Sequence, residues 1–203
     1  MSTSTRLVAL ALMAASMIGA CSDEGGISDS LSDTEIADLQ YMREEEKLAR
    51  DVYLTLHEQW ALQVFSNIAS SEQTHTEAVA STMVRLGVED PVVDDSIGVF
   101  VDPRLDELYD EMVSEGMMSA VDALRVGATI EEIDMVDIES ALDRTDEPAI
   151  VTLYDSLLCG SRNHLRSFAS ELESAGEPYV AQYLDPSELE AIVSSPREQC
   201  GPG

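Results

Sequence analysis

Apolar residues recur every three to four positions along most of the chain from about residue 33 onward, and no segment shows the strict alternation of a β-strand. This pattern predicts four long helices, over about residues 33–60, 63–86, 119–142 and 147–175. A capping-box pair, Ser32 and Glu35, predicts the start of the first helix, and Gly87 predicts the end of the second. The chain is therefore expected to be all-α.

The stretch 88–118 interrupts this periodicity with two prolines and two glycines. It encloses one amphipathic segment, DPRLDELYDEM, which predicts a short helix starting near Pro103. A second short helix is expected in the C-terminal tail, residues 176–203, from Asp185 and Pro186 to about Val193. Short links within each pair of long helices and one long crossover between the pairs predict a four-helix bundle of ferritin-like connectivity over residues 33–175.

Each long helix has ionisable or polar residues near the middle of its apolar stripe. An unpaired buried carboxylate is costly and tends to take up a proton, so four helices with this feature need a shared compensation. A metal centre would supply it. The residues concerned are Glu46 on the first helix, Glu72 and His75 on the second, Glu131 on the third, and Ser161 and His164 on the fourth.

The spacing of Glu72 and His75 places both side chains on one helix face, with Cβ atoms about 5–6 Å apart. Di-metal carboxylate bundles take a Glu from each of two helices and a Glu-x-x-His from each of the other two. Here Ser161 stands where the second such pair would have its glutamate. A water, a further carboxylate such as Asp134, or a single metal ion would fill that gap. The predicted ligands are Glu46, Glu72, His75, Glu131 and His164.

Four fragments carry a resemblance to a known family. The pattern Glu46-x-x-Ala49-Arg50-x-x-Tyr53 resembles the first-helix signature of rubrerythrin-type ferritin-like proteins. The segments MREEEKLARDVY, FSNIASSEQTH, GATIEEIDMVDI and GSRNHLRSF, in this order, resemble DUF2202, an uncharacterised ferritin-like family of bacteria and archaea. The resemblance implies a di-iron centre with two ions per chain, although manganese, zinc or copper also suit such ligands.

Several neighbouring residues have expected roles of their own. Tyr53, Arg50, Asp134 and Ser161 are candidates for orienting the ligands by hydrogen bonds; alternatively, Tyr53 belongs to the core and Arg50 and Asp134 form surface ion pairs. Three glutamates lie one or two positions off the stripe and are expected to be solvated: Glu44, Glu45 and Glu132. His57 is also off the stripe and is expected to have no role in the site.

Residues 1–20 predict an export signal, because Arg6 is their only charge and an apolar run follows it. The sequence Ile18-Gly19-Ala20-Cys21 resembles the lipobox of bacterial lipoproteins, so Cys21 is the expected lipidation site. An ordinary cleaved signal with an incidental cysteine is the alternative. Residues 21–32 are small and polar and predict a flexible tether. The protein is expected in the cell envelope, anchored to a membrane by lipid.

The chain has 203 residues, enough for one domain, and a formal net charge of −29. Such a surface repels nucleic acid and attracts cations. Cys159 and Cys200 are free to form a disulfide, and the chain lacks the paired cysteines of a rubredoxin-like domain, so electrons would come from a separate donor. Homo-oligomers remain possible. Three functions are open: a ferroxidase- or peroxidase-like oxidoreductase, a metal-binding lipoprotein without turnover, and an interaction module that has lost its metal.

Overall fold

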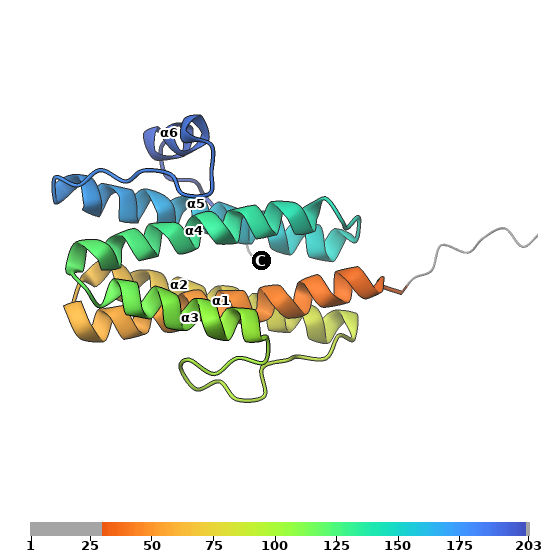
Figure 1. Ribbon diagram of the computed structural model, residues 1–203. Helices are drawn as coiled ribbons and strands as arrows, with labels where there is room; N and C mark the ends of the chain where they lie inside the picture. Colours follow the sequence, from red (N-terminus) through yellow and green to blue (C-terminus); the bar gives the residue numbers. More distant parts are fainter. Residues whose placement is uncertain (1–29, 202–203) are drawn as a thin grey trace, which may run out of the picture. The chain divides into compact units, whose positions relative to one another are not determined.

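The computed structural model describes residues 30–201, and within this range it contains helices and no β-strand (Figure 1). The predicted signal, Cys21 and most of the predicted tether lie outside the described residues. None of the helices between residues 30 and 201 is long and apolar enough to cross a membrane. The helices are α1 Asp33–Trp60, α2 Gln63–Leu86, α3 Pro103–Gly116, α4 Ala120–Leu142, α5 Pro148–Ser174 and α6 Pro186–Ser194.

The helix ends follow local chemistry closely. The Ser32 hydroxyl accepts a hydrogen bond from the Glu35 amide, and the Glu35 carboxylate accepts one from the Ser32 amide, so the predicted capping box is present. Gly87 ends α2 in the left-handed conformation with φ 74°. Asp102 caps α3 immediately before Pro103. The predicted boundaries are confirmed to within one residue at both ends of all four long helices.

The four long helices form a bundle of two helix pairs. α1 packs along α2 and α4 packs along α5, and contacts of α1 with α4 and of α2 with α5 close the bundle. The crossover between the pairs carries α3, which lies against α1 and α4 (Figure 1). This arrangement confirms the predicted all-α helical bundle with one long crossover and short accessory helices.

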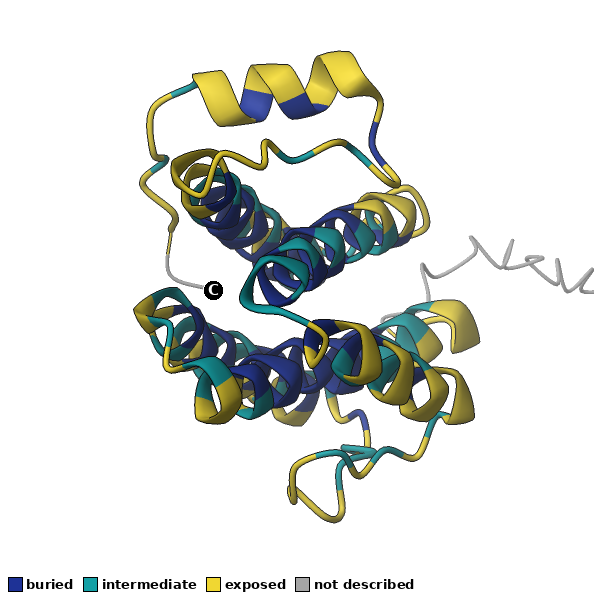
Figure 2. Cartoon of the chain, turned by 60° about the vertical axis from the view of Figure 1, so that its left-hand side comes forward, coloured by how far each residue is buried: buried dark blue, intermediate teal, exposed yellow. Residues whose placement is uncertain are grey.

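Buried residues line the inward faces of the helices (Figure 2). They form two apolar clusters. One contains Tyr53, Phe65 and Phe168, whose rings pack at centroid distances of 5.3–6.0 Å. The other contains Leu39, Val79, Ile138, Ile150 and Leu153 among its members. On α1, α2 and α5 the predicted ligands fall between residues of the first cluster and residues of the second, so a polar layer divides the core.

The outer face of α1 is covered by the crossover, which corrects the expectation that Glu44 is solvated. Glu44 is buried and accepts hydrogen bonds from the amides of Val101 and Asp102. Lys47 is also fully buried; it pairs with Asp51 at 2.5 Å and donates to the Ser96 carbonyl. Polar side chains on this face therefore hold the crossover rather than meeting water.

The expected solvation of Glu132 and Glu45 is also wrong. Glu132 is completely buried, and its Oε2 accepts hydrogen bonds from the three amides of residues 182–184. It thus attaches the segment between α5 and α6 to α4. Glu45 is 3% exposed, and neither of its carboxylate oxygens has a hydrogen-bond partner among the described residues.

The C-terminal tail is held against α5. A disulfide joins Cys159 and Cys200, with a Cα–Cα distance of 5.6 Å, as the sequence allowed. Glu198 pairs with Arg162 and Arg166, and its backbone carbonyl accepts from the Asn163 amide group. The tail is therefore fixed beside the part of α5 that carries His164.

Candidate metal centre

All five predicted ligands lie together in the polar layer of the bundle. Two trios each offer three ligand atoms within 4.8 Å of one another. Glu46, Glu72 and His75 make the first trio, which we call site A. Glu72, Glu131 and His164 make the second, which we call site B. Glu72 belongs to both, which is the arrangement expected of a carboxylate that bridges two ions.

The distances within the two sites are short. In site A, His75 Nδ1 lies 2.8 Å from Glu72 Oε2 and 3.2 Å from Glu46 Oε2. In site B, His164 Nδ1 lies 2.7 Å from Glu72 Oε1 and 3.4 Å from Glu131 Oε2. The two imidazole rings stack with centroids 5.4 Å apart. Each histidine thus directs the same ring nitrogen, Nδ1, toward the shared glutamate.

Several of these atoms lack hydrogen-bond partners although they are buried. Glu46 Oε1, Glu72 Oε1 and His164 Nδ1 make no hydrogen bond of acceptable geometry with any described residue. Glu72 Oε1 and His164 Nδ1 are only 2.7 Å apart, so direction rather than distance prevents the bond. Unpartnered oxygen and nitrogen atoms gathered within 4.8 Å of other ligand atoms fit a bound cation, and this donor set of carboxylates and imidazoles suits iron or manganese.

Neighbouring hydrogen bonds orient the ligands of site B. The Tyr53 hydroxyl donates to Glu131 Oε1 at 2.6 Å, and the Tyr53 ring also belongs to the apolar core. His164 Nε2 lies 2.9 Å from the Ser71 hydroxyl. If Nδ1 is the ligand atom, Nε2 carries the hydrogen and donates to Ser71, which fixes the ring. This contact of Ser71 was not predicted from the sequence, although Ser71 directly precedes the predicted ligand Glu72.

Asp134 and Ser161 lie beside the centre and contact each other. The Ser161 hydroxyl donates to Asp134 Oδ2, both residues are buried, and Asp134 Oδ1 has no partner among the described residues. The charges of Glu46 and Glu131 act on Asp134. The gap left by serine on α5 is thus adjoined by a carboxylate from α4, one of the alternatives that the sequence left open.

Arg50 makes no hydrogen bond or ion pair with the predicted ligands and instead forms ion pairs, the alternative expected for it. Its guanidinium pairs with Asp51 and with Asp95 of the crossover, and it donates to the Gln73 side chain. Arg50 therefore holds the crossover against α1 and α2. His57 is also remote from the site: its Nδ1 lies 3.0 Å from the Leu62 carbonyl in the α1–α2 link.

Gly160 is a further residue of the site that the sequence analysis missed. A Cβ atom at this position would lie 2.4 Å from Cε1 of His75, far inside contact distance. The absence of a side chain on α5 thus leaves room for the His75 ring between α2 and α5. The only signal in the sequence is a glycine inside a helical pattern, directly before Ser161.

The protonation of the ligands is set by their burial and mutual charges. Burial disfavours the imidazolium, but the carboxylates of Glu72 and Glu131 outweigh burial and raise the pKa of His164 to about 10. The charges of Glu72 and Glu46 likewise raise the pKa of His75. Burial raises the pKa of Glu46 to about 7 although His75 acts in the opposite direction. The surrounding carboxylates therefore favour the protonated form of both imidazoles.

We expect metal binding to release protons at pH 7 to 8 and to strengthen as the pH rises toward about 10, the raised pKa of His164. Each imidazole must lose its proton before Nδ1 can bind a metal, and an ordinary histidine has already lost it above about pH 6.5. Calorimetric titration with Mn²⁺ in buffers of different ionisation enthalpy measures the release. His57→Gln is the control and should leave it unchanged; binding without proton release at pH 7 would contradict the expectation.

A pocket of about 350 Å³ reaches site B from the surface. Its wall includes His164, Ser71, Ser167 and, from the C-terminal tail, Arg197. We call it the His164 pocket.

Residues 35–196 match the family described as "Uncharacterized protein domain (DUF2202)". A protein of Methanocaldococcus jannaschii, named "Uncharacterized protein MJ0754", is 50% identical over 169 residues, which cover 83% of this chain and 91% of the relative. A crystal structure of hypothetical protein MJ0754 from this archaeon superimposes with a TM-score of 0.82 and covers 83% of this chain and 96% of that one. The family match covers the helical bundle except for the first two residues of α1.

Proposed function

The chain belongs to the DUF2202 family, and from its polar layer we propose that it is a ferritin-like protein that binds two metal ions, most suitably iron, at sites A and B. One observation carries this proposal: four ionisable residues from four helices surround Glu72, and three of the buried atoms, Glu46 Oε1, Glu72 Oε1 and His164 Nδ1, lack hydrogen-bond partners. A core without a metal would be expected to pair these atoms with donors, because an unpartnered buried polar atom is costly.

In this proposal each residue has a defined task. Glu72 would contribute to both metal sites, Glu46 and His75 would hold an ion at site A, and Glu131 and His164 would hold one at site B. Tyr53 holds Glu131 in place, and Ser71 holds the His164 ring. Bound ferrous ions would supply electrons for the reduction of dioxygen or peroxide that enters through the His164 pocket. A separate protein would return the electrons.

Anaerobic titration of the metal-free protein with Fe²⁺, followed by exposure to air, tests this function. We expect two ions per chain from the two trios, and consumption of dioxygen by the loaded protein. Binding without consumption would favour the second candidate, a metal-binding protein without turnover. A protein that binds neither Fe²⁺ nor Mn²⁺ would refute the metal centre and leave an interaction module.

We further propose that the protein is exported and anchored through Cys21. The support comes from the sequence alone: an apolar segment ends in Gly19-Ala20-Cys21, and a polar stretch of small residues follows. One acyl chain gives only weak anchoring, so stable attachment would need several chains on this cysteine.

Cys21→Ala is therefore expected to move the protein from the membrane fraction to the soluble fraction of its native host. The acyl groups should also disappear from its mass spectrum. Cys159→Ala is the matched control, because this cysteine is engaged in the disulfide and should not affect anchoring. Unchanged fractionation and mass of Cys21→Ala would show that the signal is an ordinary cleaved one.

A further inference from the structure

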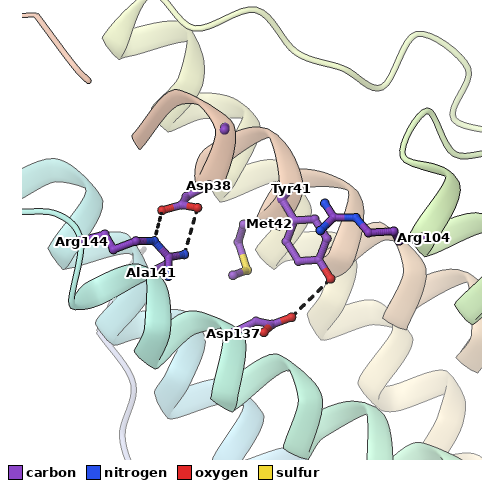
Figure 3. Close-up of a pocket in the computed structure, with 8 residues that line it drawn as sticks. Asp38, Tyr41, Met42, Arg104, Asp137, Ala141 and Arg144 are labelled. Atoms are coloured by element: carbon purple, nitrogen blue, oxygen red, sulfur yellow. Dashed lines mark hydrogen bonds and ion pairs between the residues drawn. The ribbon is translucent and has the colours of Figure 1, made fainter. Parts of the chain in front are cut away.

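A row of carboxylates leads from the surface to the candidate metal centre between α1 and α4. A surface pocket of about 240 Å³, which we call the Tyr41 pocket, is lined by Asp38, Tyr41, Arg104, Asp137 and Arg144 together with apolar residues (Figure 3). Asp137 is half-buried in its wall and accepts a hydrogen bond from the Tyr41 hydroxyl at 3.3 Å. The row continues inward through Glu45 and Asp134 to Glu46.

Glu45 is a buried carboxylate without a hydrogen-bond partner among the described residues. It is 3% exposed, and both of its oxygens lack such a partner. Burial and the negative charges of Asp134, Asp137 and Glu46 raise the pKa of its carboxyl group, which places these acids near Glu45. Two carboxylates have no hydrogen to share, so neighbouring carboxylates gain a partner only when a proton or a cation lies between the groups.

Asp134, at the inner end of the row, is also buried and also has a carboxylate oxygen without a partner among the described residues. It is 6% exposed, and the oxygen concerned is Oδ1. None of Glu45, Asp134 and Asp137 forms an ion pair with a lysine or arginine within residues 30–201. Elsewhere on α1, by contrast, buried acids such as Glu44 and Asp51 are fully engaged. Within α1, the lack of partners is therefore confined to Glu45 and Glu46, where the row meets the candidate centre.

The two arginines at the pocket mouth feel the charge of Asp137 but make their ion pairs with other carboxylates. Arg144 makes two hydrogen bonds of 2.9 Å to Asp38, and Arg104 pairs with Asp102 while it lies over the Tyr41 ring (Figure 3). Asp137 is left with the Tyr41 hydroxyl as its donor. The pocket thus presents a carboxylate at its inner wall and leads toward further carboxylates.

We propose that Asp137, Glu45 and Asp134 form the entry route by which divalent cations pass from the Tyr41 pocket to the metal centre. The three residues are not among the trios whose ligand atoms gather within 4.8 Å, so they are a succession of weak sites and not a tight cage. This is the arrangement that transit requires, because a cation must bind and then leave. The proposal rests on the proposed metal centre, whose ligands are 1–5% exposed apart from His75.

The alternative entrance is less suited to a cation. The His164 pocket is lined by uncharged polar groups, by Glu171 and by the guanidinium of Arg197. Its contact with the site is an imidazole and not a carboxylate. The structure thereby assigns cations to the Tyr41 pocket and small neutral or anionic molecules to the His164 pocket.

Stopped-flow uptake of Co²⁺ by the metal-free full-length protein tests the route. We expect Glu45→Gln and Asp137→Asn to slow uptake by about tenfold or more, because carboxylates that focus a cation raise its association rate by at least that factor. The final Co²⁺ per chain should be unchanged. Glu139→Gln is the matched control, since this exposed residue lies two positions beyond Asp137 on α4 and outside the pocket lining.

A second control separates the two entrances. Ser167→Tyr narrows the His164 pocket and should leave Co²⁺ uptake unchanged. Uptake that is slowed by Ser167→Tyr, or that proceeds at the wild-type rate in both carboxylate variants, would overturn the proposal. If Glu45→Gln does not fold, the uptake rate of Asp137→Asn, a substitution at a half-buried position in the pocket wall, tests the route instead. A wild-type protein that takes up no Co²⁺ at equilibrium would instead refute the metal centre, and the route with it.

Discussion

Replacement of Glu72 by alanine is expected to remove nearly all metal binding, whereas replacement of any other ligand should remove about half. Glu72 is the only residue shared by site A and site B, and each of its oxygens lies within 2.8 Å of a histidine Nδ1. His75→Ala should empty site A and His164→Ala should empty site B. Equilibrium dialysis against Mn²⁺ with elemental analysis gives the number of ions retained per chain.

The same substitution should also destabilise the metal-free protein. Removal of one partner from a buried ion pair costs about 3–5 kcal/mol, and Glu72 faces two imidazoles. Glu72→Gln keeps the shape of the side chain and separates loss of ligation from loss of folding. Glu77→Ala, at an exposed position of α2, is the control and should bind as the wild type does. Full metal content in folded Glu72→Gln would contradict a bridging role.

Gly160→Ala is expected to displace the His75 ring and to empty site A while site B keeps its ion. The added Cβ would lie 2.4 Å from His75 Cε1 and 2.7 Å from Nε2, and the ring cannot retreat without leaving Glu46 and Glu72. Alanine is otherwise favoured over glycine inside a helix by about 1 kcal/mol, so the fold itself should persist. Mn²⁺ content and the thermal midpoint measure the two effects separately.

Gly201→Ala is a suitable comparison, because no atom lies within 4 Å of a Cβ at that position. A double variant, Gly160→Ala with His75→Ala, adds a sharper test. Once the ring is gone the methyl group has room, so the double variant should be as stable as His75→Ala or more so. If Gly160→Ala binds as much metal as the wild type, the close approach of α5 to His75 does not control the site.

The helices, their order and the five candidate ligands could be predicted from the sequence alone. These features depend on local chemistry and on periodicity: the Ser32 cap, the Gly87 stop and the spacing of Glu72 and His75 are properties of single segments. An ionisable residue in the middle of an apolar stripe can be recognised without knowing its partner. When all four helices carry such a residue on their inward face, packing them into a bundle brings these residues together.

The residues misjudged from the sequence are those whose environment comes from outside their own helix. Glu44 and Glu132 lie off the bundle seam, and periodicity therefore assigns both glutamates to solvent. The crossover covers Glu44, and the segment before α6 covers Glu132, each through backbone amides distant in the sequence. No pattern within a single helix encodes such a neighbour.

The sequence by itself thus determined which faces of the helices turn inward and which ionisable residues they carry there. Tertiary structure alone decided that Glu72 is shared between two sites, that Gly160 leaves space for His75, and that Glu45 lies buried without a partner. The physical reason is that helical periodicity fixes the direction of a side chain to within one face. Distances of 3 Å between side chains depend on how separate helices and loops pack.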